Sequence, residues 1–200
     1  MHKLVRAVAA RVPLTLILTR ILIAGWLILD ARDGRLSAAF LPLVIYAACS
    51  DYADGLVCRL MELSSVQLSL WDGYADAIFY LAVGYSLWLA EPQLLNRHTV
   101  LLSMLCILQL VSWGFSFTKF GRITSYHTYT AKAWGVALLL SVVEALTLRS
   151  GVLVPVMVLM GVVCLLEEIA ITNVMLYWKT GVVNLRTARR LRATFKPASA

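Results

Sequence analysis

Charged residues are scarce in this chain of 200 residues, where they make up only 14% of the sequence. A typical soluble domain contains about a quarter. Hydrophobic residues make up 60%, and the mean hydropathy is +0.80, so the composition is that of a membrane protein. The formal net charge of +7 could indicate nucleic-acid binding, but the basic residues lie at the ends of apolar runs, where they suit anionic lipid headgroups. We therefore expect contact with membrane lipids and none with nucleic acid.

Cysteine pairs, long linkers and internal repeats are also lacking. The four cysteines form no CxxC pair, which argues against a disulfide framework and against a thiolate metal site. The apolar N-terminal run contains Arg20 and lacks a clear small-residue cleavage site, so it does not fit a secretory signal peptide. We expect one membrane domain over residues 1–200, with a short N-terminal arm at 1–11 and a basic C-terminal tail at 178–200.

Six apolar stretches have about the 20-residue length that a helix needs to cross a bilayer core. They cover residues 12–29, 36–55, 73–90, 99–118, 130–148 and 152–173. If all six span the membrane, the side with both termini carries twelve lysines and arginines and the other side four. Cytoplasmic loops are enriched in these residues. The predicted fold class is therefore all-α integral membrane, with six transmembrane helices and both termini cytoplasmic.

Four of the six aspartates lie near the cytoplasmic ends of the expected second and third spans. Asp51 and Asp54 are three residues apart and Asp72 and Asp76 are four apart, so each pair lies on one face of a helix. Two such faces turned towards each other would form a cage of four carboxylates. Because Arg59 is the only cation near them in the sequence, the cage calls for a divalent metal that prefers oxygen ligands. Mg²⁺ (or Mn²⁺) commonly shares such ligands with substrate phosphates, which indicates a diphosphate substrate.

The spacing of these aspartates resembles the signature of the CDP-alcohol phosphatidyltransferase family, D-x2-D-G-x2-A-R-x8-G-x3-D-x3-D. All four aspartates, Gly55 and Arg59 match it in register, and the expected six-span layout is also the family's. Two positions depart from the signature, since Cys58 replaces an alanine and Leu68 replaces a glycine. Leucine fills space that glycine leaves open, so the second departure concerns the shape of the nucleotide pocket and not the metal ligands.

The resemblance implies an enzyme of phospholipid biosynthesis that moves a phosphatidyl group from a CDP-linked lipid, CDP-diacylglycerol, to a small alcohol and releases CMP. It implies that all four aspartates hold the metal and that Asp76 also acts as general base on the acceptor hydroxyl. Asp54, Gly55 and Arg59 would seat the CDP moiety. The active site would lie at the cytoplasmic interface of a multi-pass membrane protein, and relatives are commonly homodimers.

The connection between the fourth and fifth expected spans collects basic residues on the side of the aspartates. They are Lys119, Arg122, His127 and Lys132, which suit a phosphate on the acceptor. Family members that make phosphatidylglycerophosphate carry a Gly-Lys pair near this point, which Ala131-Lys132 resembles, so glycerol 3-phosphate is the first expectation. The third span lacks the proline and lysine of their L-D-P-x-A-D-K version, which leaves inositol phosphate, inositol or another polyol open. Positive-inside charge alone is the other explanation of this basic connection.

Arg20 and two glutamates are further ionisable residues that lie inside expected spans. Arg20 ends a stretch that resembles the P-N-x-L-T-x-x-R start of several family members, and it could reach a substrate phosphate or pair with an aspartate. Glu167 and Glu168 could balance Arg20 or Lys132, and we assign them no chemistry. Intramembrane acids also serve ion-coupled transporters, and Leu68 leaves an inactive homologue open. The clustering of acids at one interface favours an enzyme over a transporter, which would hold its sites near the midplane.

Overall fold

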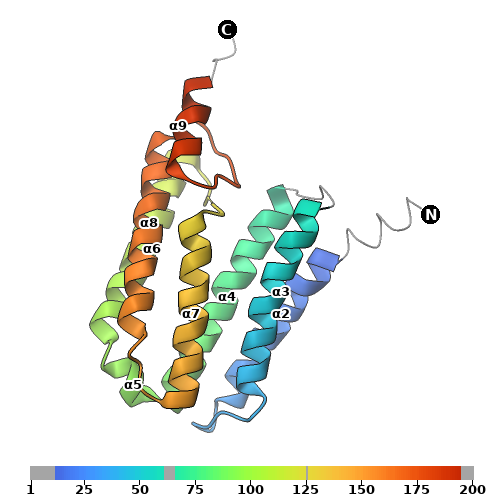
Figure 1. Ribbon diagram of the computed structural model, residues 1–200, viewed down its shortest axis with the longest axis vertical. Helices are drawn as coiled ribbons and strands as arrows, with labels where there is room; N and C mark the ends of the chain where they lie inside the picture. The colour runs from blue at the N-terminus through green and yellow to red at the C-terminus, as the bar shows by residue number, and fades with distance from the viewer. Residues whose placement is uncertain (1–11, 61–65, 125, 195–200) are drawn as a thin grey trace, which may run out of the picture. The chain divides into compact units, whose positions relative to one another are not determined.

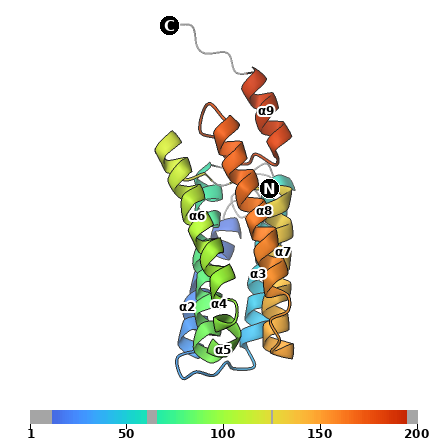
Figure 2. The ribbon, with the colours of Figure 1, turned by 90° about the vertical axis from the view of Figure 1, so that its left-hand side faces the viewer.

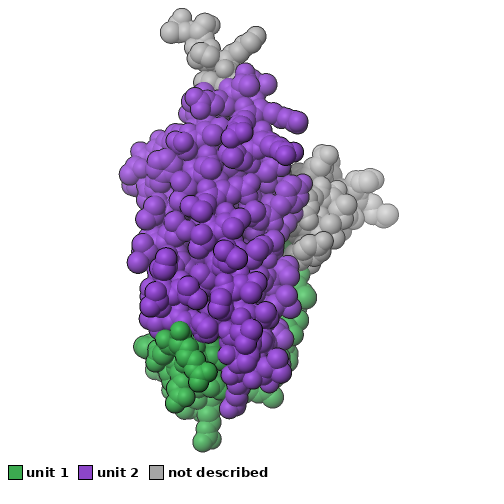
Figure 3. Space-filling view, turned by 60° about the vertical axis from the view of Figure 1, so that its left-hand side comes forward, with its two compact units in different colours: residues 1–97 green, residues 98–200 purple. Residues whose placement is uncertain are grey.

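The computed structural model describes residues 12–60, 66–124 and 126–194, apart from the side chains of residues 12, 13, 52–60, 66 and 69. In this part of the chain the secondary structure consists of helices, without strands (Figure 1). The chain forms two compact units, residues 1–97 and 98–200 (Figure 3). The predicted all-α class is confirmed for the described residues.

The described residues of the first unit form three long helices and one short one. They are α2 (Val12–Asp30), α3 (Phe40–Leu60), α4 (Val66–Ala90) and α5 (Pro92–Asn96). Helix α2 packs along both α3 and α4 (Figure 1). Buried apolar side chains from each long helix, among them Leu27, Val44 and Phe79, fill the space between them. This packing gives α2 a central place, which brings its one buried charge, on Arg20, close to both neighbouring helices.

Three long helices and one short one also make up the described part of the second unit. They are α6 (Thr99–Phe120), α7 (Tyr129–Leu148), α8 (Val154–Val174) and α9 (Leu185–Thr194). Helix α8 packs against α6, α7 and α9 (Figure 2). At Gly161 an added Cβ would lie 2.7 Å from a methyl group of Leu105 and 2.8 Å from Nε1 of Trp134. The missing side chain therefore allows α6 and α7 to approach α8 closely, as small residues do between membrane helices.

Helix ends in the second unit are closed by specific groups. Gly121, with a positive φ of 66°, follows α6 and donates its N–H to the Phe117 carbonyl oxygen at 2.8 Å, a left-handed C-cap. Thr128 precedes α7, and its hydroxyl accepts the Ala131 N–H at 3.1 Å. Buried Glu144 accepts backbone N–H groups at the start of α8. The connections are thus fixed by capping, which Gly121 and Thr128 signal in the sequence.

Three described helices, α6, α7 and α8, are long and apolar enough to cross a membrane. The apolar part of α3, Phe40–Asp51, is shorter. The integral membrane class therefore stands, while the six-span count remains a prediction. Helix α3 continues to Leu60 and α4 begins at Val66, beyond the ends of the expected spans 36–55 and 73–90. Hydropathy ended the expected spans at the polar residues, but the hydrogen-bonded helices continue past them.

Candidate metal centre

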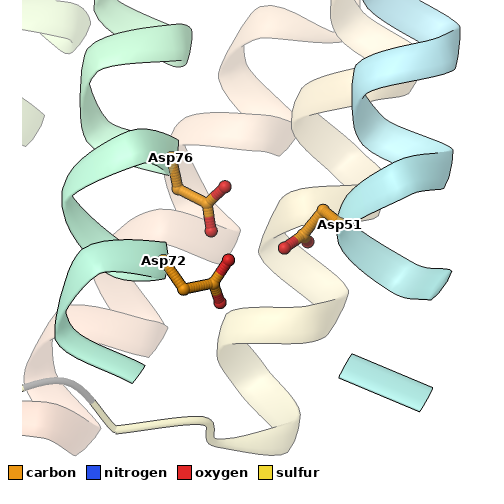
Figure 4. Close-up of side chains that lie close together, drawn as sticks. All are labelled: Asp51, Asp72 and Asp76. Carbon is orange, nitrogen blue, oxygen red and sulfur yellow. The ribbon is translucent and has the colours of Figure 1, made fainter. Parts of the chain in front are cut away.

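Three of the four predicted aspartates meet in the first unit. Asp51 extends from α3 and Asp72 and Asp76 from successive turns of α4, and their side chains point towards one another (Figure 4). One carboxylate oxygen from each lies within 4.8 Å of the other two. The side chains keep 39%, 18% and 30% of their surface exposed, respectively. The cluster is thus open enough to receive a ligand and close enough for one ion to touch all three carboxylates.

Arg20 of α2 pairs with all three carboxylates. Its side chain is only 1% exposed. Nη1 donates to Oδ1 of Asp72 at 3.1 Å and also to Oδ1 of Asp76, and Nη2 lies 3.4 Å from Oδ1 of Asp51. A planar guanidinium can do this because its N–H groups point outward in a fixed fork. The sequence left two roles open for Arg20, contact with a substrate phosphate or pairing with an aspartate. In the structure Arg20 pairs with the aspartates.

The charges and donor atoms of this cluster suit a divalent metal. Three carboxylates and one guanidinium leave a formal charge of −2, which one divalent ion balances. All three candidate ligands offer oxygen, the donor that Mg²⁺ and Mn²⁺ prefer. The three aspartates and Arg20 form a partly buried group of charges. Loss of any one of these charges would leave the remaining charges without compensation. The residues present therefore fit the metal that the sequence predicts.

The predicted CDP-binding residues lie on the last turns of α3. Asp54, Gly55 and Arg59 belong to this helix, but their side chains lie outside the described residues. Leu68 is half-buried on the first turn of α4, four residues before Asp72. Since residues four apart share a helix face, Leu68 borders the carboxylates on α4. The departure from the family's glycine therefore falls next to the cluster.

The four residues predicted to bind the acceptor belong to the second unit, on α6, on α7 and between them. Lys119 donates from Nζ to the carbonyl oxygens of Thr172 and Asn173, at 2.8 and 2.7 Å. The other two cations lie over aromatic rings: the Arg122 guanidinium is 5.6 Å from the ring centre of Trp178, and Lys132 Nζ lies 5.8 Å from that of Tyr129. His127 is exposed. Their role towards an acceptor stays a prediction.

Buried hydroxyl groups hold this connection against α6 and α8. Ser116 Oγ lies 2.5 Å from Oγ1 of Thr124 and 3.4 Å from Oγ1 of Thr172, and Thr172 donates to the phenol oxygen of Tyr126 at 3.2 Å. Burial raises the pKa of the Tyr126 phenol, so it stays protonated at neutral pH. The hydroxyls that the sequence places beside the basic residues thus serve, in part, to fix the backbone that carries them.

The glutamates of α8 have polar partners within the second unit. Glu167 accepts the Thr130 hydroxyl at 2.5 Å and the Leu185 N–H, at the start of α9, at 3.3 Å. The Ser112 hydroxyl lies 3.5 Å from Glu168 Oε2. Sequence reasoning missed the link from Glu167 to α9, because a hydrogen bond to a backbone N–H leaves no mark on the pattern of side chains.

Comparison with known proteins gives one match. The family model described as CDP-alcohol phosphatidyltransferase matches residues 10–185. The matched range includes Arg20, the three aspartates of the cluster and the basic connection between α6 and α7. No curated protein and no solved structure matches the chain significantly.

Proposed function

The chain belongs to the CDP-alcohol phosphatidyltransferase family and is a transferase of substituted phosphate groups, and we propose that it transfers the phosphatidyl group of CDP-diacylglycerol to glycerol 3-phosphate. The observation that supports this best is the meeting of Asp51, Asp72 and Asp76 in one cluster. The choice of acceptor rests on the basic residues of α7 and of the connection before it, since Lys119 of α6 donates to carbonyl oxygens of α8. Inositol phosphate would use the same cations, whereas inositol or another neutral polyol would not need them.

The four aspartates of the signature would hold Mg²⁺ or Mn²⁺. Asp51, Asp72 and Asp76 supply three carboxylates within reach of one ion, and Asp54 lies one turn beyond Asp51 on α3. When bound, the metal would neutralise the negative charge of the donor's diphosphate. Asp54, Gly55 and Arg59 would seat the CDP moiety at the end of α3.

Asp76 is the proposed general base. The acceptor hydroxyl oxygen forms a bond to the phosphorus that carries diacylglycerol, and the bond from that phosphorus to the bridging oxygen of the diphosphate breaks. The bonding electrons leave with CMP, and the proton of the hydroxyl passes to the Asp76 carboxylate. Asp76 suits this role because α4 places it one turn from Asp72, next to the proposed site of the diphosphate.

The six-span topology, with both termini and the active site at the cytoplasmic face, is part of the same proposal. Helices α2, α3 and α4 coincide broadly with expected spans, and they carry large exposed apolar side chains such as Leu22 and Leu81, 71% and 67% exposed. Such side chains suit lipid contact. We further propose one catalytic domain over residues 1–200, which works as a homodimer.

The test is release of CMP by the protein purified in detergent. The protein receives CDP-diacylglycerol, Mg²⁺ and, in turn, glycerol 3-phosphate, inositol phosphate and inositol, with the Asp76→Asn variant as control. We expect CMP only with metal and an acceptor, and most with glycerol 3-phosphate. Faster release with another acceptor reassigns the substrate. If no acceptor gives CMP, the alternatives that remain are an inactive homologue or a transporter.

A further inference from the structure

The guanidinium of Arg20 occupies the position that a counterion needs among three carboxylates. It contacts the Oδ1 atom of all three aspartates, and its side chain is 1% exposed. Three carboxylates with oxygens within 4.8 Å of each other repel strongly when nothing offsets their charge. The arginine supplies one positive charge from within the fold, before any ion arrives.

We propose that Arg20 is a built-in counterion that orders the three aspartates in the metal-free protein and lowers their affinity for divalent metal. A metal ion that shares these carboxylates meets the positive charge of Arg20 as a like charge. Arg20 therefore has two opposed effects. It stabilises the empty cluster, and it weakens binding of the ion. This role of Arg20, which acts through the aspartates as a positioning residue, rests on the proposed metal-dependent function.

The first measurement is Mn²⁺ binding, followed by the electron paramagnetic resonance signal of free Mn²⁺ with the full chain in detergent. Arg20→Gln removes the charge and is expected to bind Mn²⁺ about tenfold more tightly or better, because the like charge is gone. Arg20→Lys keeps the charge and should stay within a few-fold of the unmodified chain. Unchanged or weaker Mn²⁺ binding in Arg20→Gln overturns the proposal, since a merely structural arginine would give that result.

The second measurement is thermal unfolding with EDTA or with Mn²⁺, followed by tryptophan fluorescence. In EDTA, Arg20→Gln should lower the midpoint by about 5 °C or more, since it leaves three closely spaced, partly buried carboxylates without their cation. Mn²⁺ should raise the midpoint of this variant more than that of the unmodified chain. Gly161→Ala, whose new methyl group meets Leu105 and Trp134, is the matched control. It should lower the midpoint without a larger response to Mn²⁺.

A double variant keeps the test decisive if Arg20→Gln does not fold. Arg20→Gln combined with Asp72→Asn removes one negative charge together with the positive one. It should unfold at a higher temperature in EDTA than Arg20→Gln alone, because part of the repulsion is gone. The proposal is overturned if the double variant is no more stable than Arg20→Gln. If Arg20→Gln does not fold, the proposal is overturned when the double variant is no more abundant than the single one.

The two hypotheses fail in different ways. If the unmodified chain releases CMP from CDP-diacylglycerol but Arg20→Gln binds Mn²⁺ no more tightly, the counterion role is wrong and the proposed function stands. If Mn²⁺ binding changes as expected but no acceptor gives CMP, the proposed transfer from CDP-diacylglycerol is wrong and the counterion role stands.

Discussion

Lys119 and Lys132 both lie in the region predicted to bind the acceptor, and the structure predicts different consequences for their loss. Lys119 Nζ donates to two carbonyl oxygens, of Thr172 and Asn173, in the last turn of α8. Cations satisfy such carbonyls and interact well with the helix dipole there. Lys132, by contrast, is exposed and has a ring contact with Tyr129. We therefore expect Lys119 to hold α6 to α8 and Lys132 to serve the acceptor.

The magnitude for Lys119→Gln follows from its two hydrogen bonds. A hydrogen bond from a charged group contributes about 1.5–3 kcal/mol, but the Lys119 side chain is exposed, so screening reduces the total to about 1–2 kcal/mol. For a chain of this length that corresponds to a midpoint about 2–8 °C lower. The KM for glycerol 3-phosphate should change less than about threefold, because the ammonium group is already engaged.

Lys132→Gln is the matched variant. It should leave the unfolding midpoint nearly unchanged and lower kcat/KM for the acceptor about ten- to a hundred-fold, mainly through KM, as the loss of one charge-assisted hydrogen bond to phosphate predicts. The KM for CDP-diacylglycerol should barely move. Steady-state kinetics with each substrate varied in turn, together with thermal unfolding, separate the two residues. The reasoning is refuted if Lys119→Gln raises the acceptor's KM as much as Lys132→Gln does while the midpoint stays the same.

Metal removal should abolish CMP release, with recovery on addition of Mg²⁺ or Mn²⁺, and full turnover in excess EDTA would contradict a metal-dependent mechanism. Asp76→Asn should abolish turnover with a modest loss of donor binding, whereas Asp72→Asn should weaken Mn²⁺ binding; equal and complete loss of donor binding in both would refute this division of roles. Leu68→Gly should open space beside the cluster and lower the KM for CDP-diacylglycerol, with Leu68→Ala intermediate; a higher KM would mean that the leucine side chain helps to seat the donor. Glu144→Gln should lower the unfolding midpoint by about 2–8 °C, since charged acceptor bonds to the start of α8 are weakened, and an unchanged midpoint would show that the cap contributes little.

The aspartate cluster could be predicted from the sequence because it follows from helix geometry together with the need for a common metal ion. The spacings from Asp51 to Asp54 and from Asp72 to Asp76 place each pair on one helix face whatever the rest of the fold does. The functional requirement for a common ion then implies that the two faces meet. The structure has Asp51 opposite Asp72 and Asp76 (Figure 4). Apolar runs likewise located all six long helices, because burial in lipid or protein demands them.

For isolated charges the sequence left the choice of partner open, as it did for Arg20 between a substrate phosphate and an aspartate. Arg20 bonds to residues 52 and 56 positions further along the chain, and no local pattern reports which face of another helix will lie opposite. The partners of Glu144 and Glu167 were equally hard to predict. Each glutamate accepts backbone N–H groups, which every residue except proline can offer. The ends of α3 and α4 lie outside the expected membrane spans for a related reason: hydropathy marks the polar residues but does not mark where helical hydrogen bonds stop.

The position of Arg20 couples the packing of the first unit to the geometry of the three aspartates proposed to bind metal. The guanidinium of α2 touches Asp51 on α3 and two aspartates on α4, so a single group joins all three long helices. A lysine could offer the charge but not the planar fork that reaches three carboxylates at once. Any movement of α2 relative to its neighbours therefore changes the spacing of the carboxylates. Conversely, an ion that takes over their charge weakens the attraction between α2 and the other two helices. If the aspartates bind metal as proposed, we expect metal binding and helix packing in this unit to be linked through the Arg20 side chain.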